Sequence, residues 1–405
     1  MWLLIWQRLQ GAAPLDAVVI DLLQMLPSSF WPNPCKRVLE WRQSNKPVSG
    51  NTAAYNQARQ RLPLLVVEKA CDQIFEGLME RLTPVRDGAR IAFFLDGSSM
   101  RLAHSPALVE RFPPSSNQHG ETHWPVMRIL VAHDLQTGLG MRPHWGPMYG
   151  EEAVSEQLLL ENCIDRLPAG ATVIGDCNFG VFSVAWAATQ KGYPIVLRLT
   201  LPRAKRLLGE NPRKGMDRKV EWKPSAYERK NHPDLPVEAC IGGRVIVRQV
   251  QPKKEEKPYL LVLFTTLSEP LKQIVNLYGQ RWNIETDLRT LKSQLQMDQL
   301  SCATPEMAAK EIEMAIAAYN LVRAAICMAA QESGLQPRDY SFSRASRIVQ
   351  SFAPTIACAK SPEEAKRHFD RMVYFLKQAK LPRRKRKPYP RAVWGSGEKY
   401  PKHKT

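Results

Sequence analysis

The stretch ARIAFFLDGSSMRLA, residues 89–103, marks a change in the spacing of apolar residues along the chain. Before it, QARQRLPLLVVEKACDQIFEGLMERL, residues 57–82, has apolar residues spaced as on one face of a helix. From residue 89 the apolar run is short and continuous and ends in the turn pair Asp-Gly, which predicts a β-strand. The chain is therefore expected to pass from helices into a sheet at about residue 89.

The sequence after this stretch predicts a mixed α/β sheet. Strand-like and helix-like segments follow in the order strand, strand, helix, strand, helix, strand, over residues 127–139, 140–146, 150–167, 171–180, 181–192 and 193–201. Strands that first follow one another directly and then alternate with helices are typical of a mixed sheet with helices on its faces.

The alternation stops at Pro202, and two strand-like segments then follow without a helix between them. We interpret this region as a mainly-β insertion, after which helices resume. The expected parts are a helical region (1–88), a sheet-containing core in two pieces (89–201 and 263–330), the insertion (202–262), a C-terminal helical region (331–381) and a basic tail (382–405).

The composition indicates a polyanionic partner, and nucleic acid is the first candidate. The chain has 405 residues and a formal net charge of +18. Eleven Lys or Arg residues and one Glu lie between Leu376 and Thr405, and PRRKRKPYPR, residues 382–391, is expected to follow phosphates or else only to aid solubility. The apolar start lacks a basic segment typical of a signal peptide, no apolar run has the length of a membrane span, and the eight scattered cysteines form no C-x-x-C pair. We therefore expect a cytoplasmic protein that is not bound to a membrane.

Two aspartates follow apolar strand segments. Asp96 ends IAFFLD and Asp176 ends TVIGD. A carboxylate at the end of a strand is held on a rigid frame, although an Asp that simply caps a turn is the commoner explanation for either residue alone. Their occurrence on neighbouring strands of a strongly basic protein favours a site.

A third carboxylate lies in YGQRWNIETDLRTLK, residues 278–292, which we expect to form one helix. At about 100° per residue, the side chains of Tyr278, Arg281, Glu285 and Lys292 share one narrow stripe that borders the apolar stripe. This pattern fits either a site or an ordinary solvated face with an i,i+4 ion pair between Arg281 and Glu285. Three carboxylates without His or Cys companions suit Mg²⁺ or Mn²⁺, and two such ions can catalyse phosphoryl transfer.

The spacing Tyr278–x2–Arg281–x3–Glu285–x6–Lys292 resembles the Y-R-E-K signature of the bacterial insertion-sequence DDE transposases, the cut-and-paste group. Asp96 in LDGSSMRL and Asp176 in VIGDCNFG are similar in position to the first and second catalytic aspartates of that family, which often has Arg and then Gly-Phe after the second one. The resemblance covers roughly residues 30–395. It implies that residues 1–88 form a DNA-binding region and that 89–201 and 263–330 form a ribonuclease-H-like catalytic core with the β insertion characteristic of the family.

The resemblance also implies an activity and roles for the residues. The protein would bind terminal inverted repeats as a homodimer, associated with the nucleoid, nick the transposon end, form and reopen a hairpin, and join the 3′ end to target DNA. Asp96, Asp176 and Glu285 would hold two Mg²⁺ ions, for which Mn²⁺ can substitute. Arg281 and Lys292 would hold phosphates, with Tyr278 beside them.

Three further residues are candidate DNA contacts. Arg59 and Arg61 lie on a predicted helix and are expected to meet either the DNA backbone or solvent. Trp222, among cations in RKVEWKPS, would by the resemblance stack on a base flipped from the transposon end, or else pack within the insertion. The alternative functions are a catalytically silent DNA-binding protein on the same scaffold and a related structure-selective nuclease.

Overall fold

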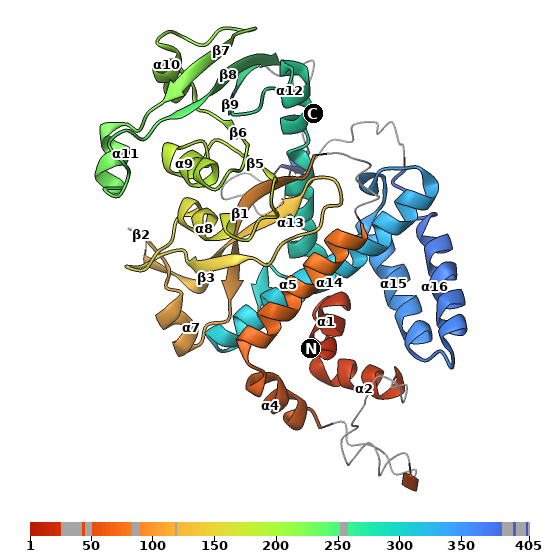
Figure 1. Ribbon diagram of the computed structural model, residues 1–405. Helices are drawn as coiled ribbons and strands as arrows, with labels where there is room; N and C mark the ends of the chain where they lie inside the picture. Colours follow the sequence, from red (N-terminus) through yellow and green to blue (C-terminus); the bar gives the residue numbers. More distant parts are fainter. Residues whose placement is uncertain are drawn as a thin grey trace.

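The structure is a computed structural model that describes residues 1–25, 43–44, 51–82, 90–117, 120–251, 258–382, 392–393 and 402–403. Figure 1 shows a sheet at one end of the molecule and long helices at the other. Except for Pro382, the basic stretch 382–391 lies outside the described residues.

The core of the sheet contains five strands in the order β4-β3-β1-β5-β6. Their bounds are β1 Ala92–Leu102, β3 Gly120–Asp134, β4 His144–Pro147, β5 Thr172–Gly175 and β6 Ile195–Arg198. The pairs β1–β3 and β3–β4 are antiparallel, whereas β1–β5 and β5–β6 are parallel. Three antiparallel strands followed by two parallel ones form the ribonuclease-H-like sheet, so the predicted fold class is confirmed.

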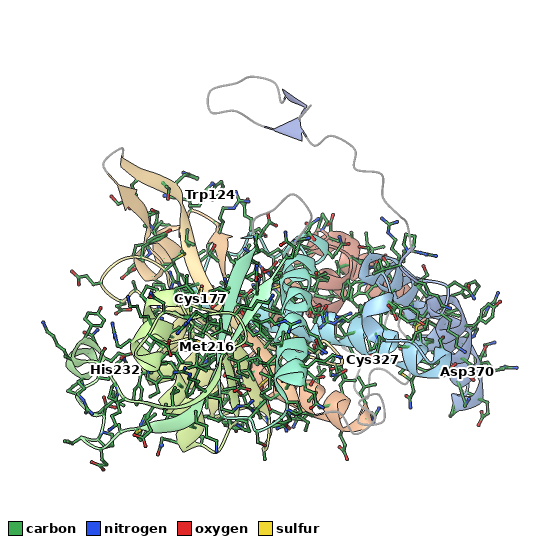
Figure 2. The ribbon with its side chains drawn as sticks, turned by 90° about the horizontal axis from the view of Figure 1, so that it is seen from above. Trp124, Cys177, Met216, His232, Cys327 and Asp370 are labelled. Carbon is green, nitrogen blue, oxygen red and sulfur yellow. The ribbon has the colours of Figure 1, made fainter. Side chains whose placement is uncertain are left out.

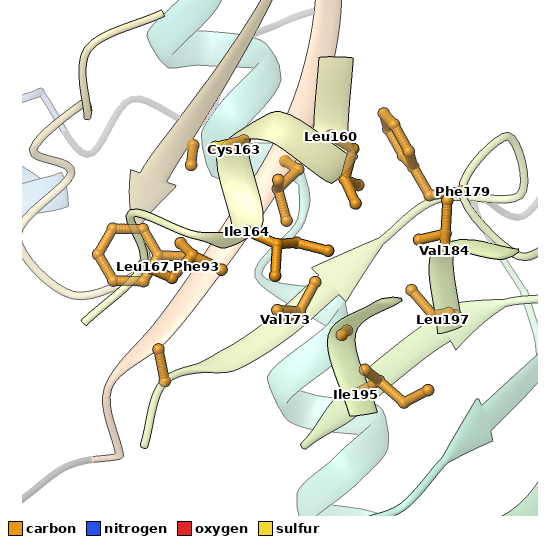
Figure 3. Close-up of a cluster of buried hydrophobic side chains, with 14 of the residues drawn as sticks. Phe93, Leu160, Cys163, Ile164, Leu167, Val173, Phe179, Val184, Ile195 and Leu197 are labelled. Atoms are coloured by element: carbon orange, nitrogen blue, oxygen red, sulfur yellow. The ribbon is translucent and has the colours of Figure 1, made fainter. Parts of the chain in front are cut away.

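Both faces of this sheet are buried, which explains the continuous apolar run in β1. Phe93 and Leu95 pack into one core, under α8 Glu156–Ile164 and α9 Phe182–Gln190. Figure 3 shows Phe93 in that core with side chains of α8, α9 and the strands. Ala92 and Phe94 point to the opposite face and pack into a second core. A strand covered on both faces is apolar at nearly every position rather than at every second one.

The β-rich segment continues the same sheet. β9 Tyr259–Thr265 pairs antiparallel with β6, and β8 Ile241–Val250 and β7 Asp217–Trp222 follow, also antiparallel. The helices of this segment are α10 Leu201–Leu208 and α11 Ala226–Asn231. In Figure 1 these elements extend the sheet as an arm at the top left.

The remaining strands are short, or lie at the edge of the sheet. β2 Pro114–Asn117 pairs with the outer part of β3, and β10 Gln299–Leu300 pairs with the end of β1. The short helix α7 Pro106–Arg111 follows β1 and precedes β2 in the sequence. Figure 2 shows Trp124 on the projecting outer part of β3. The two-residue strands β11 Ala392–Val393 and β12 Lys402–His403 pair with each other.

The α14 helix, Pro305–Ser333, joins the sheet to the helical half of the protein. It is long and apolar enough to cross a membrane by length and composition, contrary to the expectation from sequence, yet 89% of its apolar window is buried inside the protein. Helices at both ends of the chain pack against it: α1 Trp2–Leu9, α5 Leu64–Arg81, α15 Phe342–Ala357 and α16 Pro362–Leu376. We therefore interpret α14 as a core helix, and the helical terminal regions of the predicted fold class are confirmed. The shorter helices are α2 Leu15–Met25, α4 Ala53–Arg61 and the 3-10 turn η2 Pro337–Asp339.

The prediction of a single helix over residues 278–292 is wrong, because the chain forms two helices there. α12 Leu271–Gly279 has Gln280 as its C-cap residue, and α13 Trp282–Gln294 has Arg281 as its N-cap residue. At the junction the backbone hydrogen bonds span three residues, from Arg281 N to Tyr278 O and from Ile284 N to Arg281 O, both 3.0 Å. Such a tighter turn changes the angle per residue. Tyr278 therefore belongs to a different helix from Glu285 and Lys292.

Candidate active site

Asp96 and Asp176 lie side by side across the β1–β5 pair. The last paired residues are Phe94 and Ile174, so each aspartate lies two residues beyond its half of the same pair. Adjacent strands are about 4.8 Å apart, so the two carboxyl groups lie close together at the carboxyl end of β5. Asp96 does not end its strand as expected, since β1 continues to Leu102. It is β5 that ends at Gly175, leaving Asp176 in the following loop.

The electrostatics of Asp96 reflect this proximity. Burial, together with the nearby charges of Asp176 and Glu156, raises the pKa of Asp96 to about 6, while a hydrogen bond from the Gly97 backbone and the charge of Arg281 act against the rise. Like charges held close together disfavour a second ionisation until a cation is near. The pair thus has the electrostatic character of a cation site.

Glu285 and Lys292 line a cavity of about 640 Å³ together with Asp96. The wall on the β1 side is Asp96, Gly97 and Ser98, and α13 supplies the opposite wall. The guanidinium of Arg281 forms a 2.7 Å ion pair with Glu285. The structure therefore brings Asp96, Asp176, Arg281, Glu285 and Lys292 together in one region.

Tyr278 is buried at the edge of this region. Its side chain is 4% exposed, and its hydroxyl has no hydrogen-bond partner among the described residues. Burial raises the pKa of this phenol above its ordinary value, against the nearby charge of Arg281. A buried, unpaired hydroxyl is costly unless it gains a partner.

The donor chemistry of the site suits a hard cation, although the carboxylates do not all converge. No three His, Cys, Asp or Glu side chains within the described ranges lie close enough to hold a metal ion. Asp96 and Asp176 supply carboxylate oxygens, the donors that Mg²⁺ and Mn²⁺ prefer. These two carboxylates repel one another, so a bound cation would relieve the repulsion. Glu285 faces the same cavity but is engaged by Arg281. The oxygen donors of the two aspartates are therefore of the type that suits a divalent ion, while Glu285 pairs with Arg281.

The structure does not bring the other three predicted residues to this site. Arg59 on α4 is turned inward, and its guanidinium lies 3.6 Å from the carboxylate of Glu311 on α14. Arg61, on the same helix, is exposed. Trp222 is 2% exposed and packs edge-on against Phe264 at 4.8 Å between ring centroids. As Trp222 lies, a base could reach its ring only if the core around it opened.

This packing predicts a loss of stability when Trp222 is shortened. We expect Trp222→Ala to lower the free energy of unfolding by about 3–5 kcal/mol, because it removes a large side chain from a closed core. Trp222→Phe, which keeps most of the volume, should cost less than about 1.5 kcal/mol. Denaturant unfolding measures both variants. Unchanged stability of Trp222→Ala together with reduced DNA cleavage would instead favour a direct contact with DNA.

Sequence reasoning missed several polar residues around the site. Glu156 at the start of α8 accepts a 2.5 Å hydrogen bond from the side chain of Asn178, two residues after Asp176. Asp287 on α13 is 2% exposed and forms ion pairs with Arg323 and Arg338. Neither acid had a usable signal, because a Glu in the first turn of a helix and an Asp in mid-helix are ordinary surface features.

The fold is that of the ribonuclease-H-like enzymes, and it carries an acidic pair at the strand edge where β1 and β5 meet. The chain belongs to the transposase DDE domain family, whose model matches residues 87–321. It is 26% identical over 416 residues to the transposase InsG for insertion sequence element IS4 of Escherichia coli (strain K12), covering 99% of this chain and 86% of that protein. The predicted class, a DNA-cleaving and strand-transferring transposase, is confirmed, and DNA is its partner.

A solved structure gives a weaker match. The cryo-EM structure of a piggyBac transposase synaptic complex with hairpin DNA is 14% identical, with a TM-score of 0.40, over 90% of this chain and 77% of that chain. This similarity is too low to support an inference about this chain. Membership of the DDE family implies a divalent metal ion as cofactor without specifying which one.

Proposed function

We propose that this transposase excises an insertion sequence at its terminal inverted repeats through a DNA hairpin and joins the freed 3′ end to target DNA. The observation that carries the proposal is the cavity shared by Asp96, Glu285 and Lys292, with Asp176 beside Asp96. Mg²⁺ is the proposed ion, with Mn²⁺ as a substitute, held by Asp96, Asp176 and Glu285. Two such ions, when bound, would activate the attacking oxygen and stabilise the leaving oxygen.

The remaining side chains would orient the DNA strand. Lys292, whose pKa is lowered by burial, would place its ammonium group against a phosphate within the cavity. Arg281 would exchange its carboxylate partner for a phosphate, which would free Glu285 to join the aspartates. The Tyr278 hydroxyl would then gain a hydrogen-bond acceptor. In this proposal the arrival of DNA completes the site.

The proposal extends to the assembly and to the wider DNA contacts. We propose a homodimer acting on two transposon ends in the bacterial cytoplasm at the nucleoid, with residues 382–405 and exposed Arg61 contacting the DNA backbone. The net charge of +18 supports the DNA contacts, because each contact between a basic side chain and a phosphate releases a condensed counterion.

The experiment is a cleavage assay on a labelled duplex that carries the terminal repeat found beside the gene, with Mg²⁺, Mn²⁺ or no metal. We expect hairpin products with either metal, and none on a duplex with a scrambled terminus. A second substrate, pre-nicked at the transposon end, is made with either a 3′-hydroxyl or a 3′-hydrogen. Only the hydroxyl form should yield a hairpin, because it alone has the attacking oxygen.

The alternative functions predict other products. Nicks without hairpins on the 3′-hydroxyl substrate would indicate a structure-selective nuclease. A shifted but uncut duplex with both metals would indicate a catalytically silent DNA-binding protein.

A further inference from the structure

Glu156 connects the two segments that carry Asp96 and Asp176. It is the first residue of α8, after Ser155, whose hydroxyl accepts a hydrogen bond from Leu158 N and so caps the helix. Its half-buried carboxylate lies over Gly97, next to Asp96. A Cβ atom on Gly97 would come within 2.2 Å of that carboxylate. Glu156 therefore lies directly against the β1 segment at Gly97, and a side chain there would push the Glu156 carboxylate aside.

On its other side, Glu156 holds the loop after β5. The side-chain amide of Asn178 donates to Glu156 Oε2 at 2.5 Å, and Gln157 Nε2 donates to the backbone oxygen of Asn178 at 2.7 Å. Asn178 N in turn donates to Asp176 Oδ1 at 2.8 Å. Asn178 is thus bound at three points, between the N-terminal end of α8 and the carboxylate of Asp176.

This geometry answers a problem that the site itself creates. Asp96 and Asp176 repel each other, and the half-buried Asp176 lies in the loop after β5 rather than in a strand. Without a tether, the loop would relax by moving Asp176 away from β1. A hydrogen bond to an ionised carboxylate is short and strong, and Glu156 supplies one from a rigid helix end.

We propose that Glu156 is a positioning residue, which sets the separation of the Asp96 and Asp176 carboxylates by bonding Asn178 to the carboxylate that lies over Gly97. The proposal rests on the proposed function of the two aspartates. Glu156 acts through Asn178, because its Oε2 atom is engaged there.

The test compares Glu156→Ala, Glu156→Gln and Asn178→Ala with the double variant Glu156→Ala/Asn178→Ala. Glu152→Ala is the control, since Glu152 is an exposed carboxylate just before α8 that pairs only with Arg111 among the described residues. Three quantities are measured on the full-length protein: the affinity for Mn²⁺ without DNA, from the free-ion electron paramagnetic resonance signal; amide hydrogen exchange in residues 174–182; and the single-turnover rate of cleavage.

We expect Glu156→Ala to weaken Mn²⁺ binding and to slow cleavage by about 10–100-fold, the usual effect of removing a group that orients a metal-binding side chain. DNA affinity should be unchanged, and exchange in residues 174–182 should be faster. Glu156→Gln keeps an acceptor oxygen and should stay within about threefold of the parent protein. Asn178→Ala should match Glu156→Ala, and the double variant should be no worse than either, because both changes remove one shared interaction.

Other outcomes overturn the inference. Additive losses in the double variant would show that Glu156 does not act through Asn178. A Glu156→Gln variant as impaired as Glu156→Ala would assign the effect to charge rather than to the tether. Unchanged Mn²⁺ affinity and hydrogen exchange in Glu156→Ala would remove the positioning role even if the parent protein cleaves DNA. If the parent does not cleave, the proposed function fails, and the Mn²⁺ and exchange measurements still decide the role of Glu156.

Discussion

Alanine at Asp96, Asp176 or Glu285 is expected to reduce cleavage of terminal-repeat DNA by about a thousandfold or more while leaving DNA binding intact. Stabilisation of the transition state by a bound metal ion amounts to several kcal/mol, and each 1.36 kcal/mol corresponds to a factor of ten in rate. Removal of one member of a self-repelling pair does not destabilise the fold, since the burial and repulsion that raise the pKa of Asp96 are relieved. The loss should therefore fall on the chemical step.

The measurements are single-turnover hairpin and nick formation, together with a gel-shift titration of the same duplex. Asp298→Asn is the matched control, because Asp298 lines the same cavity but pairs with Arg101 at the surface. It should stay within about fivefold of the parent rate, because an exposed ion pair contributes at most about 1 kcal/mol, which corresponds to about that factor in rate. Full Mg²⁺ activity in any of the three alanine variants would exclude that residue from the site.

Asp176→Cys tests whether the role of Asp176 is ligation. The change replaces a hard oxygen with a soft sulfur, which Mg²⁺ binds poorly and Mn²⁺ tolerates better. We expect activity to be lost in Mg²⁺ and partly restored in Mn²⁺. Equal loss with both ions, in a folded variant that still binds DNA, would argue that Asp176 acts in another way.

Asp287→Ala should lower the free energy of unfolding by about 3–5 kcal/mol at neutral pH. Asp287 is 2% exposed, and its Oδ1 atom lies 3.0 Å from Arg323 Nη2 and 2.5 Å from Arg338 Nη1. Removal of the carboxylate leaves the buried Arg323 and the partly exposed Arg338 without this anion, and an uncompensated buried charge costs about that much. Because Asp287 lies on α13, cleavage should also fall through the displacement of Glu285.

The pH dependence of stability gives an independent check. Burial alone would raise the pKa of Asp287, but Arg323 and Arg338 outweigh it, and the pKa is lowered from 3.8. The stability contributed by the carboxylate is therefore complete above about pH 4 and is lost as the pH falls further. The difference in unfolding free energy between the parent and Asp287→Ala should be largest at neutral pH and shrink in acid.

Urea unfolding of both proteins across this pH range measures the effect. Asp370→Ala is the control, because Asp370 forms an exposed i,i+4 pair with Lys366. Its loss should cost no more than about 0.5 kcal/mol. A cost for Asp287→Ala as small as that of the control would show that the buried ion pairs do not stabilise α13.

The predictions that the structure confirmed came from the local spacing of apolar and polar residues in the sequence. The apolar run before Asp96 predicted a strand, and the strands and helices after it predicted a mixed sheet, because these features depend on the period of side chains along a few residues. The spacing of Tyr278, Arg281, Glu285 and Lys292 pointed to the transposase family in the same way. The break at Arg281 was not predicted, since a tighter turn leaves the apolar spacing on either side unchanged.

The sequence by itself therefore determined the fold class and the family to which the chain belongs, but not every element, because α10, β7, α11 and the break between α12 and α13 were not predicted. Only the tertiary structure decided which partner each polar side chain meets. Periodicity states which face of an element is buried, but it does not say what lies opposite that face. Arg59 turned inward to Glu311, and Trp222 joined the core. Asp287 met Arg323 and Arg338, because contacts between residues far apart in sequence form only when the sheet and α14 have packed together.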